Sequence, residues 1–473
     1  MLLSLLFWTL SLADSTAKPS AVADTVQRDY WVVRSVHIHG NHRTRERIIL
    51  RELEVKAGDT IQRPQLTEKL AWDQRKVTNT NLFITVDVTA KEVSANEIDI
   101  EINLKERWYV FVIPIFDLAD RNFNEWWYER GRSFRRTIYG ARLNYKNVTG
   151  NADKINAIFE FGFTRRTQVV YSLPYIDKAQ KTGISFGASY QTNKEVAYRS
   201  AFDKLVYFRS EDLMRDRFFT NVILTRRNQF YNFHRLELRL VRNAIADTVA
   251  KLNPDYFLNG QTRQRYFLLS YLFTHDRRDA VAYPLRGHYL NLTANQYGLL
   301  PSDNVRLFEV MASYTRYWPL GGASPGAKFY ASNSVRGKLS WPERQPYTNL
   351  RGLGYLSDFV RGYELYVIDG QRYGLVRNTL KYQLLNVRKH IRWMPMKQFN
   401  TLPLALYVSL FGDMGYVNST LAQEYNSRLA NSWLYGGGVA LDVATFYNIV
   451  GRISYSVNRQ GQTGVFFNFT YDL

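Results

Sequence analysis

One loop of the chain carries residue types that could form a directed ionic contact. Residues 358–366 read Asp-Phe-Val-Arg-Gly-Tyr-Glu-Leu-Tyr, a charged, glycine-broken loop among strand-like segments, and Arg361 is its candidate residue. A guanidinium presents a planar fork of donors, so a carboxylate that meets it bidentately fixes its direction as well as its place. Taken alone, an Arg-Gly pair is more typical of a solvated surface turn.

A carboxylate of suitable placement follows about fifty residues later, at Asp413. The even positions of the preceding segment are aliphatic: Leu404, Leu406, Val408 and Leu410. The odd positions are mixed or polar: Ala405, Tyr407, Ser409, Phe411 and Asp413. Because strand side chains alternate between two faces, we expect the aliphatic face to contact lipid and Asp413 to point into a barrel lumen.

Two motifs carry a family resemblance. Val360-Arg361-Gly362-Tyr363 resembles the Val-Arg-Gly-Phe/Tyr motif of the BamA/TamA superfamily of outer-membrane assembly and translocation factors, and Phe411-Gly412-Asp413-Met414-Gly415 resembles its Phe-x-Asp-x-Gly strand motif. The resemblance implies that a long extracellular loop folds back into the lumen, with residues 360–363 as a latch and Asp413 as its partner. Thr379 departs from the acidic residue expected there, which implies one carboxylate fewer.

Composition excludes several classes of protein. No stretch of the 473 residues has the 18 or more apolar residues that a membrane helix requires. The chain has no cysteine, which excludes disulfides, thiolate metal sites, a cysteine nucleophile and a lipid-modified cysteine. The abundant aromatic residues (15%) suit the girdles of an outer-membrane barrel, although a large soluble β-protein could share them.

The positive charge is unevenly distributed. Residues 30–107 contain 13 Lys and Arg against 12 Asp and Glu, so nearly all of the formal net charge of +20 lies beyond them. The arginines there are dispersed among alternating strands and loops. This pattern favours an anionic lipopolysaccharide surface or a charged lumen over nucleic acid as the partner.

The N-terminal segment predicts export. Residues 2–12 are an apolar run followed by Ser15-Thr16-Ala17, so we expect a signal peptide over 1–17 and a mature tail over 18–29. No Lys or Arg precedes the apolar run, which indicates a truncated start.

Residues 30–107 predict a small α/β domain in the order strand, helix, helix, strand, strand. Thr44 is the expected N-cap of the first helix. Ile84, Val86 and Val88 are the expected inward residues of the second strand. This order resembles a POTRA domain, whose exposed sheet edge can accept an extended segment. A single copy is present, where BamA-like proteins usually carry several.

Residues 108–473 predict a transmembrane antiparallel β-barrel of about sixteen strands. Its last strand presents one apolar face, formed by Val465, Phe467, Phe469, Tyr471 and Leu473. Its first strand runs from Trp108 to Phe116, is apolar on both faces and contains Pro114, which cannot donate to a ladder. We therefore expect a weak seam where the first and last strands meet.

Motifs of catalysis are scarce. The sequence has no Gly-x-Ser-x-Gly elbow or His-Glu-x-x-His pair, and Gly436-Gly437-Gly438 lies in a strand pattern that favours a bend over a phosphate loop. His37, His39 and His42 lie close together, but a wet strand edge explains them without a metal. We expect a protein that is not an enzyme, with no cofactor and no metal.

These patterns favour a factor of the bacterial outer membrane, with its POTRA domain in the periplasm, that inserts or translocates unfolded client polypeptides through the seam. Two alternatives remain: a secretion translocase or passive channel, and a structural accessory barrel of a larger envelope complex. The expected partners are lipid and lipopolysaccharide, client polypeptides, and accessory proteins of the periplasm or outer membrane.

Overall fold

The computed structural model describes residues 29–177, 179, 181–229, 231–281, 283–321, 327–355, 357–390, 401–445 and 449–470. The expected signal peptide and all of the expected tail except Asp29 lie outside these residues. The chain divides into two compact units between Arg107 and Trp108. None of the helices in the described ranges has the length and hydrophobicity needed to cross a membrane.

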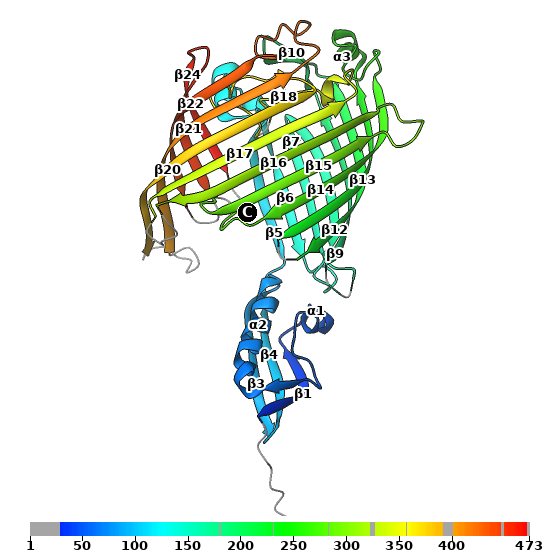
Figure 1. Ribbon diagram of the computed structural model, residues 1–473. Coiled ribbons are helices and arrows are strands. Elements are labelled where there is room, and N and C mark those ends of the chain that lie inside the picture. The colour runs from blue at the N-terminus through cyan, green and yellow to red at the C-terminus, as the bar shows by residue number, and fades with distance from the viewer. Residues whose placement is uncertain are drawn as a thin grey trace, which may run out of the picture. The chain divides into compact units, whose positions relative to one another are not determined.

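The first unit is a four-stranded sheet with two helices (Figure 1). Its strand order is β2-β1-β4-β3, with β1 parallel to β4 and the other pairs antiparallel. The elements are β1 (Tyr30–His39), α1 (Glu46–Leu50), β2 (Thr60–Gln62), η1 (Arg63–Gln65), α2 (Leu66–Asn79), β3 (Phe83–Ser94) and β4 (Glu97–Glu106).

Two sequence expectations for this unit are wrong in detail. Ile84 is 57% exposed, because the β3–β4 register shifts between Phe83 and Thr85 and reverses the alternation at that point. The N-cap of α1 is Arg45, not Thr44. Thr44 instead donates from its backbone N–H and its Oγ1 to Glu106, at 2.7 and 2.6 Å.

The second unit is built on one antiparallel sheet of sixteen strands, which confirms the predicted fold (Figure 1). The strands are β5 (Val110–Leu118), β6 (Thr137–Lys146), β7 (Lys154–Gly162), β8 (Thr164–Leu173), β9 (Thr182–Asn193), β12 (Arg215–Asn228), β13 (Asn232–Ile245), β14 (Arg263–Asp276), β15 (Gly287–Tyr297), β16 (Leu307–Leu320), β17 (Phe329–Trp341), β20 (Arg372–His390), β21 (Thr401–Asn418), β22 (Trp433–Ala444), β23 (Val450–Asn458) and β24 (Thr463–Thr470).

The two faces of this sheet differ in chemistry, as a barrel wall requires. On β21 the outward Val408 and Leu410 are 40% and 58% exposed, whereas the inward Tyr407, Ser409 and Phe411 are buried. Aliphatic and aromatic residues exposed on the outer face of the other strands repeat this pattern. The outer face is therefore suited to lipid and the inner face to polar contacts.

Short elements occupy the loops at the rim where β5 ends. They are η2 (Glu125–Glu129), η3 (Phe134–Arg136), β10 (Glu195–Ala201), β11 (Lys204–Arg209), α3 (Asp247–Leu252), η4 (Tyr347–Asn349), β18 (Arg351–Leu353) and β19 (Ile368–Asp369). The longest of these loops connects β17 to β20. We call residues 342–371 the returning loop and residues 119–136, between β5 and β6, the first-hairpin loop.

Candidate functional site: a loop latch and an unpaired seam

The returning loop is fixed to the barrel wall by Arg361. Its Nε and Nη2 lie 2.7 and 2.5 Å from the two carboxylate oxygens of Asp413, and its backbone N–H donates to the same carboxylate at 3.1 Å. The guanidinium also lies 4.1 Å from the ring centroid of Phe411. The side chains of Arg361 and Asp413 are 8% and 0% exposed, so this ion pair is shielded from water.

The departure at Thr379 is accommodated by a hydroxyl. Arg361 Nη1 donates to Thr379 Oγ1 at 3.1 Å, and Nη2 also donates to the carbonyl of Asn378 at 3.1 Å. These two neutral oxygens accept hydrogen bonds from guanidinium N–H groups that do not bond Asp413. A second carboxylate is therefore not needed to satisfy the arginine.

Backbone geometry lets the loop lie against the wall. Gly362 has φ of +99°, a conformation that favours glycine. Gly436 on β22 faces the carbonyl oxygen of Arg361, and a Cβ built on that glycine would lie 1.8 Å from it. The loop side chains Val360 and Tyr363 are buried, at 1% and 2% exposed, in a cluster formed with the strands that follow the loop.

A second contact to the inner wall comes from the turn between β14 and β15. The Tyr283 hydroxyl donates to Asp442 on β22 at 2.6 Å, and Asp442 also pairs with Arg452 on β23. The ring of Tyr283 lies tilted against that of Tyr407, with 4.8 Å between ring centroids.

The seam is a gap in the backbone hydrogen bonding of the sheet. β5 is bonded to β6 alone and β24 to β23 alone, and within the described residues no ladder joins β5 to β24. Pro114 lies opposite Ala141 in the β5–β6 ladder. Trp108 is 74% exposed.

The apolar face expected for the last strand is described only in part. Val465 and Phe467 are 44% and 37% exposed on β24, as outward residues would be. The side chain of Phe469 and residues Tyr471 and Leu473 lie outside the described part of the chain.

One side chain of the first-hairpin loop covers the open edge of β24. Asn124 Nδ2 donates to the carbonyl of Val465 at 2.6 Å, and Asn124 Oδ1 accepts from the N–H of Phe467 at 3.2 Å. These are the two backbone groups on either side of Phe466, the pair that a residue of a parallel strand would bond. The side-chain amide thus substitutes for one residue of a missing neighbour strand.

The first-hairpin loop also bonds the returning loop. Arg121 Nη1 donates to the carbonyls of Gly354 and Tyr366 at 2.6 and 2.9 Å, and Asn122 Nδ2 donates to the carbonyl of Glu364 at 2.8 Å. The Asn122 carboxamide oxygen accepts from the Glu125 backbone N–H at 2.8 Å. A continuous set of contacts therefore connects the latch segment 360–363 with the edge of β24.

The described geometry offers backbone hydrogen bonding at open strand edges. Backbone groups at the strand edges can exchange hydrogen bonds with an extended polypeptide. In the described ranges no group of three or more His, Asp or Glu side chains could hold a metal ion.

Comparisons with known proteins agree with this architecture. Residues 147–471 match the Omp85 superfamily domain, and residues 32–107 match the POTRA description, "Surface antigen variable number repeat". The chain is similar in structure to BamA from Haemophilus ducreyi lacking POTRA domains 1–3 (TM-score 0.64, 14% identity, 93% of this chain and 84% of that chain). It is also similar to CdiB from Escherichia coli (TM-score 0.53, 13% identity, 93% and 76%). Comparison with curated proteins finds no match.

Proposed function

The chain belongs to the Omp85 superfamily, and from this membership we propose that it is an outer-membrane factor that inserts or translocates polypeptides through the seam between β5 and β24. Its POTRA domain lies in the periplasm and presents client segments. Lipid and lipopolysaccharide surround the barrel, and accessory proteins of the periplasm or outer membrane join it. No chemical catalysis is required.

The observation that carries this proposal is the unpaired edge of β24. Two strand edges without a mutual ladder leave backbone N–H and C=O groups available to an incoming strand. Only the side chain of Asn124 occupies two of these groups in the described part of β24. A client strand offers a full row of backbone groups in place of one amide, so it displaces Asn124 and extends the sheet.

The returning loop supports insertion through the wall over free passage along the lumen. Arg361 holds the loop against the inner face of β21, and Tyr363 donates to Gln460 next to β23 at 2.7 Å. A loop anchored to the wall by a shielded ion pair obstructs the lumen. A passive channel would have to release these contacts.

Cross-linking tests the proposal, because the chain has no native cysteine. The rings of Phe123 and Phe467 lie 6.1 Å apart, so cysteines at these positions are within reach of a short bifunctional thiol reagent. We expect the cross-link to abolish insertion of an unfolded barrel client into liposomes while the barrel keeps its heat-resistant folded form. Insertion at the uncross-linked rate would refute entry through the seam.

The matched control joins two strands that are already paired. The rings of Tyr139 on β6 and Phe161 on β7 lie 6.3 Å apart across an intact ladder. Cross-linked cysteines there should leave client insertion unchanged. Loss of insertion in this control as well would mean that general rigidity, and not closure of the seam, accounts for the effect.

A further inference from the structure

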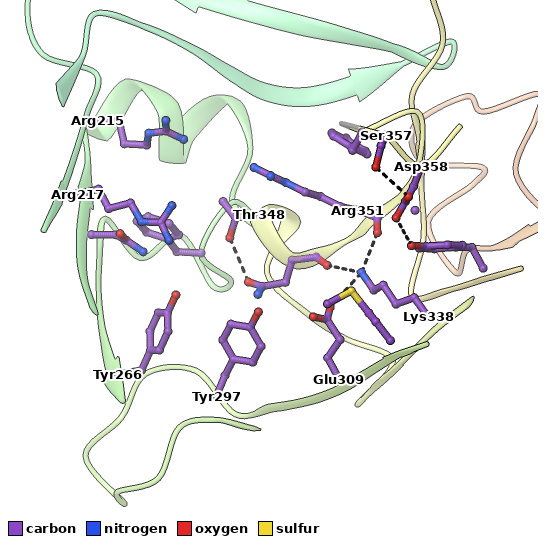
Figure 2. Close-up of a pocket in the computed structure, with 17 residues that line it drawn as sticks. Arg215, Arg217, Tyr266, Tyr297, Glu309, Lys338, Thr348, Arg351, Ser357 and Asp358 are labelled. Carbon is purple, nitrogen blue, oxygen red and sulfur yellow. Dashed lines mark hydrogen bonds and ion pairs between the residues drawn. The ribbon is translucent and has the colours of Figure 1, made fainter. Parts of the chain in front are cut away.

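A cavity of about 340 Å³ lies inside the barrel, lined by none of the latch residues 360–363 and by no residue of β5 or β24 (Figure 2). It is lined by residues of β12 to β17 and of β20, by the loop between β13 and β14, and by the returning loop. The proposed insertion function makes no use of it. Its volume falls within the range of small-molecule sites.

Three guanidiniums line this cavity. Arg215 and Arg217 come from the start of β12, where alternate positions share a face, and Arg351 comes from β18. Figure 2 shows Arg215 and Arg217 on one side, with Arg351 reaching toward them from the other. Three like charges around one small space repel one another unless an anion lies between them.

No carboxylate in the described part of the chain pairs with any of these three arginines. The guanidinium of Arg217 makes no hydrogen bond to the described residues, and its Nε is buried without a partner. The Nε of Arg215 is in the same situation, although its Nη2 donates to Asn193 Oδ1 at 2.9 Å. Buried donors without acceptors are costly, so these groups are suited to an acceptor that enters from solution.

The two acidic residues of the cavity already pair with cations other than these three arginines. Glu309 lies 3.3 Å from Lys338 Nζ, and Asp358 lies 2.5 Å from Arg336 Nη1. Lys338 is further held by the carbonyl of Arg351 at 2.8 Å. The lining therefore keeps an excess of positive charge on the side formed by Arg215, Arg217 and Arg351.

Aromatic residues complete the wall. Tyr266 and Tyr297 line the cavity next to each other, with ring centroids 5.9 Å apart, and Figure 2 shows their hydroxyls directed into the space between the arginines. Hydroxyls can donate to an oxyanion, and aromatic rings can support the apolar face of a sugar or similar group.

We propose that this cavity binds a compact phosphate-bearing anion, held by Arg215, Arg217 and Arg351. A guanidinium can donate two parallel hydrogen bonds to two oxygens of one phosphate, and three guanidiniums can approach a tetrahedral anion from different sides. The phosphate comes either from a small soluble phosphate ester or from a lipid headgroup. Binding fixes the returning loop to β12, because Arg351 belongs to the loop and the other two arginines belong to the wall.

The test uses the full-length protein in detergent at constant ionic strength, titrated with inorganic phosphate by calorimetry. We expect one phosphate per chain and a rise in thermal unfolding temperature on binding. Arg217→Gln and Arg351→Gln should each weaken phosphate binding by about tenfold or more, since a hydrogen bond to a charged group is worth about 1.5–3 kcal/mol. Arg217→Lys keeps the charge but not the fork, and should bind with intermediate affinity.

Arg265→Gln is the matched control, because Arg265 lies next to Tyr266 on β14 but on the exposed face of the sheet. Phosphate affinity should be unchanged in this variant. No phosphate binding by the native chain, or equal weakening by Arg265→Gln and Arg217→Gln, would overturn the site. Retention of the heat-resistant band in each variant separates lost binding from lost folding.

Two further ligands identify the source of the phosphate. A sugar phosphate that displaces inorganic phosphate in an Arg217-dependent manner indicates a soluble ester. Displacement by phosphatidic acid in mixed micelles, but not by the sugar phosphate, indicates a lipid headgroup. If neither the sugar phosphate nor phosphatidic acid displaces bound phosphate, the proposal that the site binds a phosphate ester or a lipid headgroup is wrong.

Discussion

Arg361 and Asp413 lie 52 residues apart in sequence and meet through three hydrogen bonds, two from the guanidinium and one from the arginine backbone. The backbone bond means that the carboxylate holds the loop itself, as well as its side chain. Arg377 approaches the same carboxylate, with its Nε 3.9 Å from Asp413 Oδ2, and donates to the carbonyl of Phe359. Asp413 is therefore the acceptor that fixes the returning loop to β21.

Removing either partner should destabilise the barrel. Arg361→Ala leaves Asp413 buried without its main donor, and loss of one partner of a buried pair costs about 3–5 kcal/mol. We expect Arg361→Ala and Asp413→Asn to lower the temperature at which the folded band is lost on gels. The exposed Arg306→Ala serves as control and should change little. Unchanged heat resistance in both test variants would refute the latch.

The approach of the loop to β22 predicts an effect of a single methyl group. Gly436→Ala places a Cβ against the carbonyl oxygen of Arg361, so either the loop or the strand must shift. Such overpacking costs about 1–3 kcal/mol. Gly412→Ala on the neighbouring strand meets no atom within 4 Å and should be tolerated. Equal thermal stability of the two variants by circular dichroism would mean that the loop does not lie against β22.

Local periodicity accounts for what the sequence predicted well. Alternation with period two requires only neighbouring residues, so it predicted the two-faced strands of the barrel and the inward face of β21. The number of about sixteen strands came from the length of residues 108–473 and from the family resemblance. It failed at Ile84, because the register shift in β3 depends on its pairing with β4. The sequence shows three glycines at 436–438, from which we predicted a bend. It does not predict that the returning loop lies directly against Gly436.

The contacts that sequence analysis missed are non-local and carry no local signal. Asn124 bonds Phe467 across 343 positions, and an asparagine in a loop is ordinarily a turn residue. The cavity arginines are likewise brought together by a non-local contact, since Arg217 lies on the wall strand β12 and Arg351 on the returning loop. Charge counts indicated a basic barrel but could not place three guanidiniums in one space.

The POTRA domain should lose stability in strong acid through Asp99. Hydrogen bonds from Arg34 and then from Ser35 lower the pKa of Asp99 from 3.8 to about 2. Because the folded pKa is below the unfolded value, ionised Asp99 stabilises the fold above about pH 4, and this contribution is lost as the pH falls toward about 2.

Hydrogen exchange of β1 and β4 in the full chain, corrected for intrinsic rates, measures this loss. Asp99→Asn should remove the pH dependence between about 4 and 2. Asp87→Asn, at an exposed position of β3, should retain it. The same pH dependence in Asp99→Asn and in the native chain would assign the acid sensitivity to another group.

The edge of β24 should respond to Asn124 in a graded order. Asn124→Asp can still accept from the Phe467 N–H but cannot donate to the Val465 carbonyl, whereas Asn124→Ala can do neither. A neutral hydrogen bond contributes about 0.5–1.5 kcal/mol, so amide exchange at Phe467 should accelerate about two- to tenfold in Asn124→Ala. We expect client insertion to accelerate in the same order, because the Asn124 side chain competes with the client strand for the edge of β24.

Amides of β15, which is paired on both sides, provide the internal reference and should not change. Faster exchange without faster insertion would show that Asn124 protects the strand edge but does not limit client entry.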